Sequence, residues 1–387
     1  MKKMKLAYLL AIILAFCSCK KMNSVTPIVE QKLMVSDFVG AGGAAFKDGV
    51  GDGAAFNLPN SMTIDATGNL FVADNNNLRI RKVTPDGTVS TFAGNGIQGY
   101  LDGTGTTAKF GYNTSISIDA QNNLYVADPE NSCIRKITPT GVVSTLVGAP
   151  GRSNLDGPIA TAGVSFRNIP DLTVDGLNNV YFIDNKGIRK VGINGIVSTV
   201  VKIGSSNITG PIATSAINNP LHITSDKNGN VFVSSLSQSN LLIFKISIDG
   251  VLSRYAGAPD GEVGYQLGIS DVARFTRTRS LTSDKLGNIF ITDNNHVVVK
   301  ITTDGYVRHV AGIQYTGVYL PFVPGSAMTA TLPDIIDVAI DPNNGTLYVL
   351  EESPSSICKI ALIDKPTTPP TQTEIDKANW NKPTGWK

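Results

Sequence analysis

Six polar side chains recur at one fixed position along this chain, and their types could support chemistry. Each lies four residues before an aspartate that enters a turn, and the six are Ser61, Ser115, Asp171, His222, Ser280 and Asp337. Two carboxylates and an imidazole around one opening could hold a divalent cation such as calcium, or act as an acid/base pair. Asp171 and Asp337 are the candidate metal ligands. The alternative is a ring of side chains that binds water.

Further residues beside this position complete a candidate ligand-binding site. Arg277 and Arg279 could bind a carboxylate or a phosphate, or could pair with Asp334 or Asp337. Tyr112, Tyr315 and Tyr319 could serve as platforms for a glycan. The candidate ligand-binding set is Asn60, Tyr112, Asp171, His222, Arg277, Arg279 and Asp337. No residue is assigned a catalytic role.

These residues are positioned by a pattern that recurs six times. The turn-entering aspartates are 51 to 58 residues apart, at Asp65, Asp119, Asp175, Asp226, Asp284 and Asp341. Each copy contains short alternating strands separated by turns such as Asn122-Asn123 and Asp86-Gly87. A repeat of about this length, built only from short strands, is typical of a β-propeller blade. The sequence therefore predicts an all-β, six-bladed propeller with four antiparallel strands in each blade.

The two ends of the repeat region predict how the ring closes. The sixth copy stops after its third strand, whereas residues 34–40 (MVSDFVG) match a fourth strand such as VSTFAG at 89–94. We expect the N-terminal strand to complete blade 6, because pairing the two ends leaves no free edge. The propeller is predicted to span residues 34–363, with the polar series at the mouth of its central channel.

Two other acidic series recur in the copies. One ends the second strands, at Asp74, Asp128, Asp184, Asp293 and Glu351, and we expect these residues to accept backbone N–H groups of nearby loops. The other lies in the loops between blades, at Asp48, Asp102 and Asp156. Turn formation explains the second series better than calcium binding, because the fixed ligand spacing of a calcium-binding loop is missing.

Several chemistries find no support in the sequence. The chain has three histidines, His222, His296 and His309, and their predicted positions differ too much for a three-histidine zinc site. No P-loop and no G-x-S-x-G motif occurs. Cys133 and Cys358 fall in the second and the sixth copy, so we expect free, half-buried thiols rather than a disulfide.

The N-terminus predicts an envelope protein held by lipid. Residues 1–18 form a signal peptide with a basic start and an apolar run, too short to span a bilayer. The sequence around Cys19 resembles a bacterial lipobox, so we expect a diacylated Cys19 and a tether over 19–33; the alternative is an ordinary cleaved signal peptide. The anchored protein would face the periplasm or the cell surface. A Pro/Thr-rich linker and tail fill residues 364–387.

The charge balance excludes one class of partner. The formal net charge is +2, and it is near −1 without Lys2, Lys3 and Lys5, so no basic field exists to attract nucleic acid. We expect a monomer that binds a protein or carbohydrate ligand and meets the membrane through its lipid anchor.

Segments of the copies resemble NHL repeats. The resemblance rests on NLYVAD followed by IRKITPTG, and on the loop DGTGTTAKF; it covers residues 35–363 and is strongest in copies one, two and five. Copy four departs from the family pattern with Ser234-Ser235 where Asp is usual and Phe244 where Arg is usual, and copy six has Glu351. The resemblance implies an NHL/TolB-like propeller with a binding surface at one face of the ring.

Relatives of this fold imply an enzymatic alternative. Peptide-amidating lyases use a histidine-bound zinc, and this chain lacks their histidines. Gluconolactonase-like hydrolases place carboxylates and Asn around one cation, and Asp171, Asp337, Asn60 and Asn219 could supply similar groups. The sequence therefore favours a non-catalytic binding or scaffold module for protein or glycan ligands. A metal-assisted lactonase or lyase at the channel mouth is the alternative.

Overall fold

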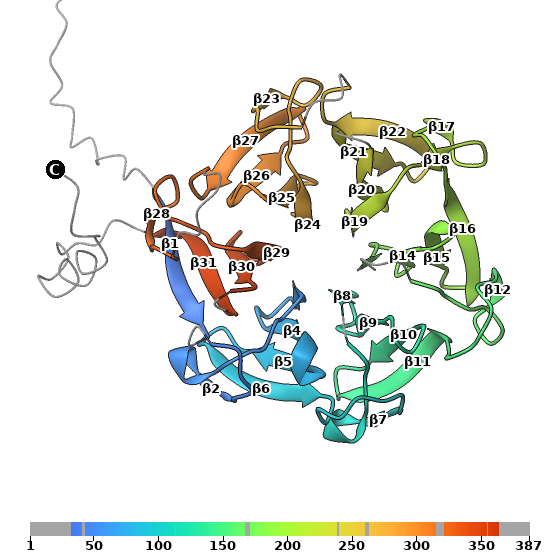
Figure 1. The fold of residues 1–387 in the computed structure, drawn as a ribbon, viewed down its shortest axis with the longest axis horizontal. Helices are drawn as coiled ribbons and strands as arrows, with labels where there is room; N and C mark the ends of the chain where they lie inside the picture. The colour runs from blue at the N-terminus through green and yellow to red at the C-terminus, as the bar shows by residue number, and fades with distance from the viewer. Residues whose placement is uncertain are drawn as a thin grey trace, which may run out of the picture. The chain divides into compact units, whose positions relative to one another are not determined.

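The computed structural model describes residues 32–40, 43–112, 114–166, 171–237, 240–259, 263–314, 321–353 and 355–363. All of them belong to one compact unit, Lys32–Ile363. Six sheets are arranged as blades around a central channel, as predicted (Figure 1). Cys19, the remainder of residues 1–31 and the tail 364–387 lie outside the described residues. Within the described ranges, no helix has the length and apolar character needed to cross a bilayer.

The first three blades follow one another along the chain. Blade 1 contains β2 (Gly49–Val50), β3 (Ser61–Ile64), β4 (Leu70–Asp74), β5 (Arg79–Val83) and β6 (Thr88–Ala93). Blade 2 contains β7 (Gly103–Thr104), β8 (Ser115–Ile118), β9 (Leu124–Asp128), β10 (Cys133–Ile137) and β11 (Val142–Gly148). Blade 3 contains β12 (Gly157–Pro158), β13 (Leu172–Val174), β14 (Val180–Asp184), β15 (Gly187–Val191) and β16 (Ile196–Ile203), with β18 (Ala216–Ile217) pairing parallel to β16.

The last three blades repeat this arrangement. Blade 4 contains β17 (Gly210–Pro211), β19 (Pro220–Ser225), β20 (Val231–Ser237), β21 (Asn240–Ile246) and β22 (Val251–Ala256). Blade 5 contains β23 (Gly268–Ile269), β24 (Thr278–Ser283), β25 (Ile289–Asp293), β26 (Val297–Ile301) and β27 (Tyr306–Ala311). Blade 6 contains β28 (Gly325–Ser326), β29 (Ile335–Ile340), β30 (Leu347–Glu351), β31 (Ser356–Ile363) and β1 (Lys32–Val39). Short 3-10 helices η1 (Gly51–Gly53), η2 (Asn75–Asn77) and η3 (Gly105–Thr107) lie in connecting loops.

Each blade has the four predicted antiparallel strands and a short fifth strand that was not predicted. The fifth strand pairs with the outer edge of the fourth, as in the pairing of Gly49 with Val89 in blade 1. A two-residue strand has no alternation that the sequence could reveal. It covers part of an edge that would otherwise be unpaired.

The ring closes as the sequence predicts. β1 pairs antiparallel with β31, with Val35 opposite Ile360 and Ser36 opposite Lys359, and so becomes the fourth strand of blade 6. The inner strands contact one another in the order β3, β8, β13, β19, β24 and β29, and β29 returns to β3. These six inner strands line the channel and carry the polar series.

The aspartate turns fix where each inner strand ends. In blade 1, Oδ1 of Asp65 accepts the backbone N–H groups of Thr67 and Asn69 at 2.8 and 2.9 Å. Asn122 and Asn178 have φ values of 61° and 64° in the equivalent turns, a conformation that Asn tolerates. The same turn recurs in blades 1 to 5, whereas the turn at Asp341 in blade 6 is one residue longer and bonds only the N–H of Asn343 to Oδ1 of the aspartate.

The hydrophobic core consists of six clusters, one between each pair of neighbouring blades. Blades 1 and 2, for example, share a cluster that contains Phe71 and Phe110. Cys133 and Cys358 are free thiols, as predicted, but they are fully buried rather than half-buried. Because every cluster draws on two blades, each blade depends on its neighbours for its packing.

Candidate functional site

A cavity of about 230 Å³ lies at the mouth of the channel, and all six blades contribute to its lining. Six of the seven predicted site residues line it: Asn60, Asp171, His222, Arg277, Arg279 and Asp337. The seventh, Tyr112, is 42% exposed and is not among the lining residues. Tyr315 and Tyr319, the other predicted platforms, lie outside the described residues.

Asp337 is buried and is held by donors from three blades. Its Oδ2 accepts the backbone N–H of Met62 in blade 1 at 2.6 Å, and its Oδ1 accepts its neighbour Val338 N–H at 2.8 Å. The hydroxyl of Ser280 in blade 5 donates to the same Oδ1. Burial raises the pKa of Asp337 to about 6, and the charge of Asp171 adds to that rise.

Asp171 in blade 3 accepts hydrogen bonds in the same way as Asp337 in blade 6. Its Oδ1 accepts the hydroxyl of Ser115 at 2.6 Å and the backbone N–H of Leu172 at 2.8 Å. Its Oδ2 accepts the backbone N–H of Ile223 in blade 4 at 2.9 Å. Nδ1 of His222 lies 3.5 Å from the same Oδ2, at a side-chain exposure of 14%. Both carboxylates therefore connect neighbouring blades.

The serines of this series extend the connections around the ring. Oγ of Ser61 accepts the N–H of Ile116 at 3.3 Å, and Oγ of Ser115 accepts the N–H of Leu172 at 3.1 Å. The polar series thus connects several blades to the next one, a role that the sequence analysis did not predict.

A β-bulge places two arginines at the mouth. In β24 the register shifts between Thr278, opposite Asp293, and Ser280, opposite Thr292, so Arg279 is the extra residue. Such a bulge turns a side chain away from regular alternation. As a result, consecutive residues of blade 5 reach the cavity, from Arg277 to Ser280.

The two arginines do not form the ion pairs with Asp334 or Asp337 that the sequence left open. Among the described residues, neither Arg277 nor Arg279 forms an ion pair with Asp334 or Asp337. Nε of Arg279 instead donates to Oδ1 of Asn294 at 3.2 Å. The guanidinium groups at the mouth therefore keep their charge unpaired by the described part of the chain.

The two predicted metal ligands, Asp171 and Asp337, both line the cavity, but they do not belong to a larger group of ligands. Within the described ranges, no group of three or more His, Cys, Asp or Glu side chains could hold a metal ion. Asn219, a candidate ligand in the lactonase alternative, does not line the cavity, and its Nδ2 donates to the carbonyl of Leu236 at 3.2 Å. The oxygens of Asp171 and Asp337 accept hydrogen bonds from the protein instead.

The acidic residues that end the second strands have the predicted role and a second role that was not predicted. They do accept loop N–H groups, such as Asn57 N–H on Asp74 at 2.8 Å. In blades 1 to 3, however, each also pairs with a fully buried arginine: Arg81 with Asp74, Arg135 with Asp128 and Arg189 with Asp184.

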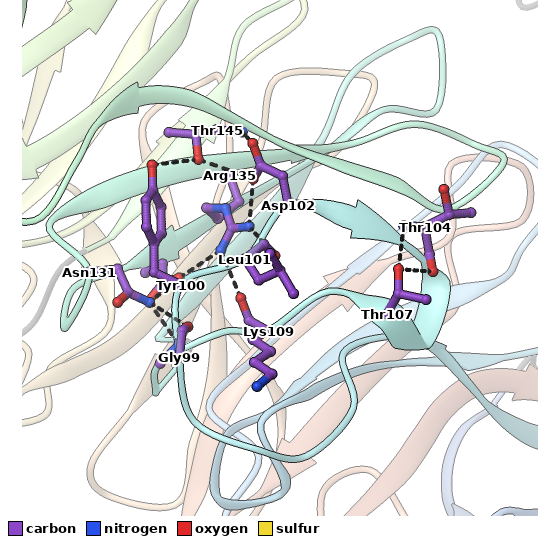
Figure 2. A network of polar contacts seen from close by, with 12 residues as sticks. Gly99, Tyr100, Leu101, Asp102, Thr104, Thr107, Lys109, Asn131, Arg135 and Thr145 are labelled. Carbon is purple, nitrogen blue, oxygen red and sulfur yellow. Dashed lines mark hydrogen bonds and ion pairs between the residues drawn. The ribbon is translucent and has the colours of Figure 1, made fainter.

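The inter-blade aspartates complete these buried ion pairs, a role that the prediction of turn formation missed. Asp102 accepts Nη2 of Arg135 at 2.7 Å, and Asp48 and Asp156 bind Arg81 and Arg189 in the same way. Figure 2 shows Arg135 between Asp102 and the carbonyls of Leu101 and Lys109, with Thr145 bound to Asp102. The signal in the sequence was an arginine at a fixed place in the third strand of each of these copies.

Comparison with known proteins agrees with the architecture. The family model of the NHL repeat matches residues 56–83. Teneurin-4 of Mus musculus is 25% identical to the chain over 331 residues, which cover 81% of this chain and 10% of teneurin-4. The chain therefore spans about a tenth of the length of the curated relatives it matches.

Two solved structures share the fold. A structural genomics protein of unknown function from Bacteroides thetaiotaomicron has a TM-score of 0.64 at 19% identity, over 86% of this chain and 77% of that protein. An auxiliary nutrient binding protein from Bacteroides ovatus has a TM-score of 0.62 at 15% identity, over the same shares. The chain is therefore a six-bladed β-propeller closed by its N-terminal strand, and blade 1 contains a segment that matches the NHL repeat.

Proposed function

We propose that this chain is a non-catalytic binding module of the bacterial cell envelope, and that its channel mouth takes part of a protein or glycan ligand. The observation that carries the proposal is the bonding of Asp171 and Asp337. Each carboxylate accepts three hydrogen bonds from the protein, two of them from other blades. The carboxylates of Asp171 and Asp337 therefore stabilise the packing of the blades. The cavity beside them is lined by polar groups that could bind a ligand.

A metal-assisted lactonase or lyase is the second candidate. The observation in its favour is the pKa of Asp337, which burial raises to about 6, within the range where general acids and bases operate. Against it, a catalytic carboxyl must reach a reacting atom, whereas Asp337 is only 6% exposed and is bonded on both oxygens.

The envelope location is part of the proposal and rests on the N-terminal sequence. A diacylated Cys19 would anchor the propeller through residues 19–31. The solved structures called auxiliary nutrient binding proteins support a binding role for the same fold. Labelling of cells with tagged palmitate tests the anchor, with a Cys19→Ala variant as the comparison and Cys17→Ala as its control. Incorporation that survives in Cys19→Ala would contradict it.

One experiment separates binding from catalysis. The chain is purified without chelator, and its unfolding temperature is measured against a panel of saccharides and peptides. A ligand present at about 100 times its Kd should add about 2.7 kcal/mol of stability. Metal content and lactone turnover are measured on the same protein and on an Asp171→Asn/Asp337→Asn variant. One equivalent of metal and turnover that both vanish in the variant would establish the enzymatic candidate instead.

A further inference from the structure

We propose that the channel mouth recognises an acidic sugar unit, a hydroxylated carboxylate, and that Arg277 and Arg279 bind its carboxylate. The inference rests on the proposed binding function and names the ligand class of that site. It follows from the charges at the mouth, the position of the two arginines in the lining and the character of the remaining lining.

The two mouth arginines differ from the buried arginines of this chain. Arg81, Arg135 and Arg189 are fully buried, and each pairs with two carboxylates. Arg277 is exposed and Arg279 half-buried, and neither pairs with a carboxylate of the described residues. A ligand carboxylate would supply the partner that the protein supplies elsewhere, through charge-assisted hydrogen bonds.

Local structure holds these arginines in place. The bulge at Arg279 directs consecutive side chains of blade 5 toward the cavity. Asn294 holds the side chain of Arg279 and the backbone of Arg277, because its Oδ1 accepts Nε of Arg279 at 3.2 Å and its N–H donates to the carbonyl of Arg277 at 2.9 Å. The terminal nitrogens of Arg279 are left to face a ligand, and a held guanidinium loses less entropy when it binds.

In the described part of the chain, the acidic residues of the lining form no ion pair with Arg277 or Arg279. Asp337 and Asp171 are engaged by backbone and serine donors, and His222 lies beside Asp171. Glu352 also lines the cavity, and it forms no ion pair with Arg277 or Arg279 among the described residues. The anion that completes the site therefore comes from the ligand.

The remaining lining favours hydroxyl groups. Asn60, Ser61, Thr114 and Thr278 offer hydrogen-bond donors and acceptors, and Ile336 is the one apolar side chain of the lining. A volume of 230 Å³ equals that of about eight water molecules in the liquid, which leaves room for a single sugar unit. None of the described residues that line the cavity is aromatic, so this part of the lining offers a neutral sugar no stacking surface, and a carboxylate would carry much of the affinity.

Isothermal titration of the full chain with D-galacturonate and D-galactose tests the inference, because the two differ only at the carboxylate. Arg277→Gln and Arg279→Gln remove one charge each. Arg308→Gln is the matched control, since Arg308 lies exposed on β27 of the same blade, away from the cavity. A short peptide with a C-terminal glutamate is titrated as well, to distinguish an acidic sugar from an acidic peptide.

We expect galacturonate to bind at least tenfold more tightly than galactose. Each mouth variant should weaken galacturonate binding at least tenfold, whereas Arg308→Gln should stay within twofold of the native chain. Equal affinity for both sugars, unchanged affinity in both mouth variants, preference for the peptide or no binding of galacturonate would each overturn the inference. If another compound still stabilises the chain and a mouth variant abolishes that effect, the proposed binding function survives and only its ligand class is wrong.

Discussion

Asp171 and Asp337 occupy equivalent positions three blades apart, and the neighbouring blades bind them in the same way. Each accepts a serine hydroxyl from the preceding blade, Ser115 or Ser280, and a backbone N–H from the following blade. The environments differ at one place, because His222 lies beside Asp171 whereas Ser61 holds the equivalent position next to Asp337. Asp171 thus connects blades 2, 3 and 4, and Asp337 connects blades 5, 6 and 1.

The first prediction concerns the serine donors. Ser280→Ala and Ser115→Ala should each lower the free energy of unfolding by about 1.5–3 kcal/mol, because each removes a buried hydrogen bond to a carboxylate. Ser144→Ala in β11, where the serine is exposed, is the control and should change little. Urea unfolding measures the three variants. Equal stability of all three would show that the ring of hydrogen bonds contributes nothing.

The second prediction concerns pH. The pKa of Asp337 rises from 3.8 to about 6 in the folded chain because the group is buried, which corresponds to about 3 kcal/mol. A raised folded pKa means that the native state binds the proton more tightly than the unfolded state. The contribution of this group to stability therefore falls as pH rises from about 4 to about 6.

Asp337→Asn should remove that part of the pH dependence. The difference in unfolding free energy between the native chain and the variant should change by about 3 kcal/mol between pH 4 and pH 7, with the native chain losing stability. Chemical unfolding at a series of pH values checks this. A difference that stays constant with pH would contradict the raised pKa.

The third prediction concerns the buried arginines. Arg135→Met should destabilise the chain by about 3–5 kcal/mol, because Asp128 would stay buried without its cation. A second change, Asp128→Asn, should recover part of the loss in the double variant. Blade 4 already lacks this pair, with Ser235 and Phe244 at the two positions. A double variant less stable than Arg135→Met would contradict the explanation, as would a single variant with native stability.

The fourth prediction concerns ring closure. Val39 of β1 is 1% exposed and packs in the cluster between blades 6 and 1. Val39→Asp should cost more than about 4 kcal/mol, since it buries an unpaired charge and frees the edge of β31. Ser36→Asp on the same strand, at an exposed position, is the control. The elution volume and the unfolding temperature report the outcome, and native-like values for Val39→Asp would show that β1 is dispensable.

The repeat in the sequence was sufficient for the fold because its strongest signals are local. The turn at Asp65 needs only Asp65, Thr67 and Asn69, and the apolar run of β4 needs only its own residues. The sequence also showed that the sixth copy has three strands where the other copies have four, and this difference predicted that the N-terminal strand completes blade 6. The short fifth strands were not, because two residues carry no periodicity.

The candidate site was predicted less completely because its contacts join distant residues. The fixed offset brought Asp171, His222 and Asp337 to the mouth, but their bonding to other blades depends on the register of the ring. The bulge that turns Arg279 inward arises from pairing with β25 and leaves no mark in the sequence. Tyr112, which was predicted to belong to the site, is not among the residues that line the cavity.

The central claim is that a ligand occupies the channel mouth, and hydrogen exchange of the full chain with and without saturating galacturonate tests it most directly. The account predicts slower exchange in segments that line the mouth, around residues 60–62, 220–223, 277–280 and 336–338, because a bound sugar unit shields their amides. The turns around residues 176–179 and 285–288, at the other ends of the inner strands, should not change. Protection confined to those turns, or absent throughout under conditions where titration shows saturation, would contradict the account.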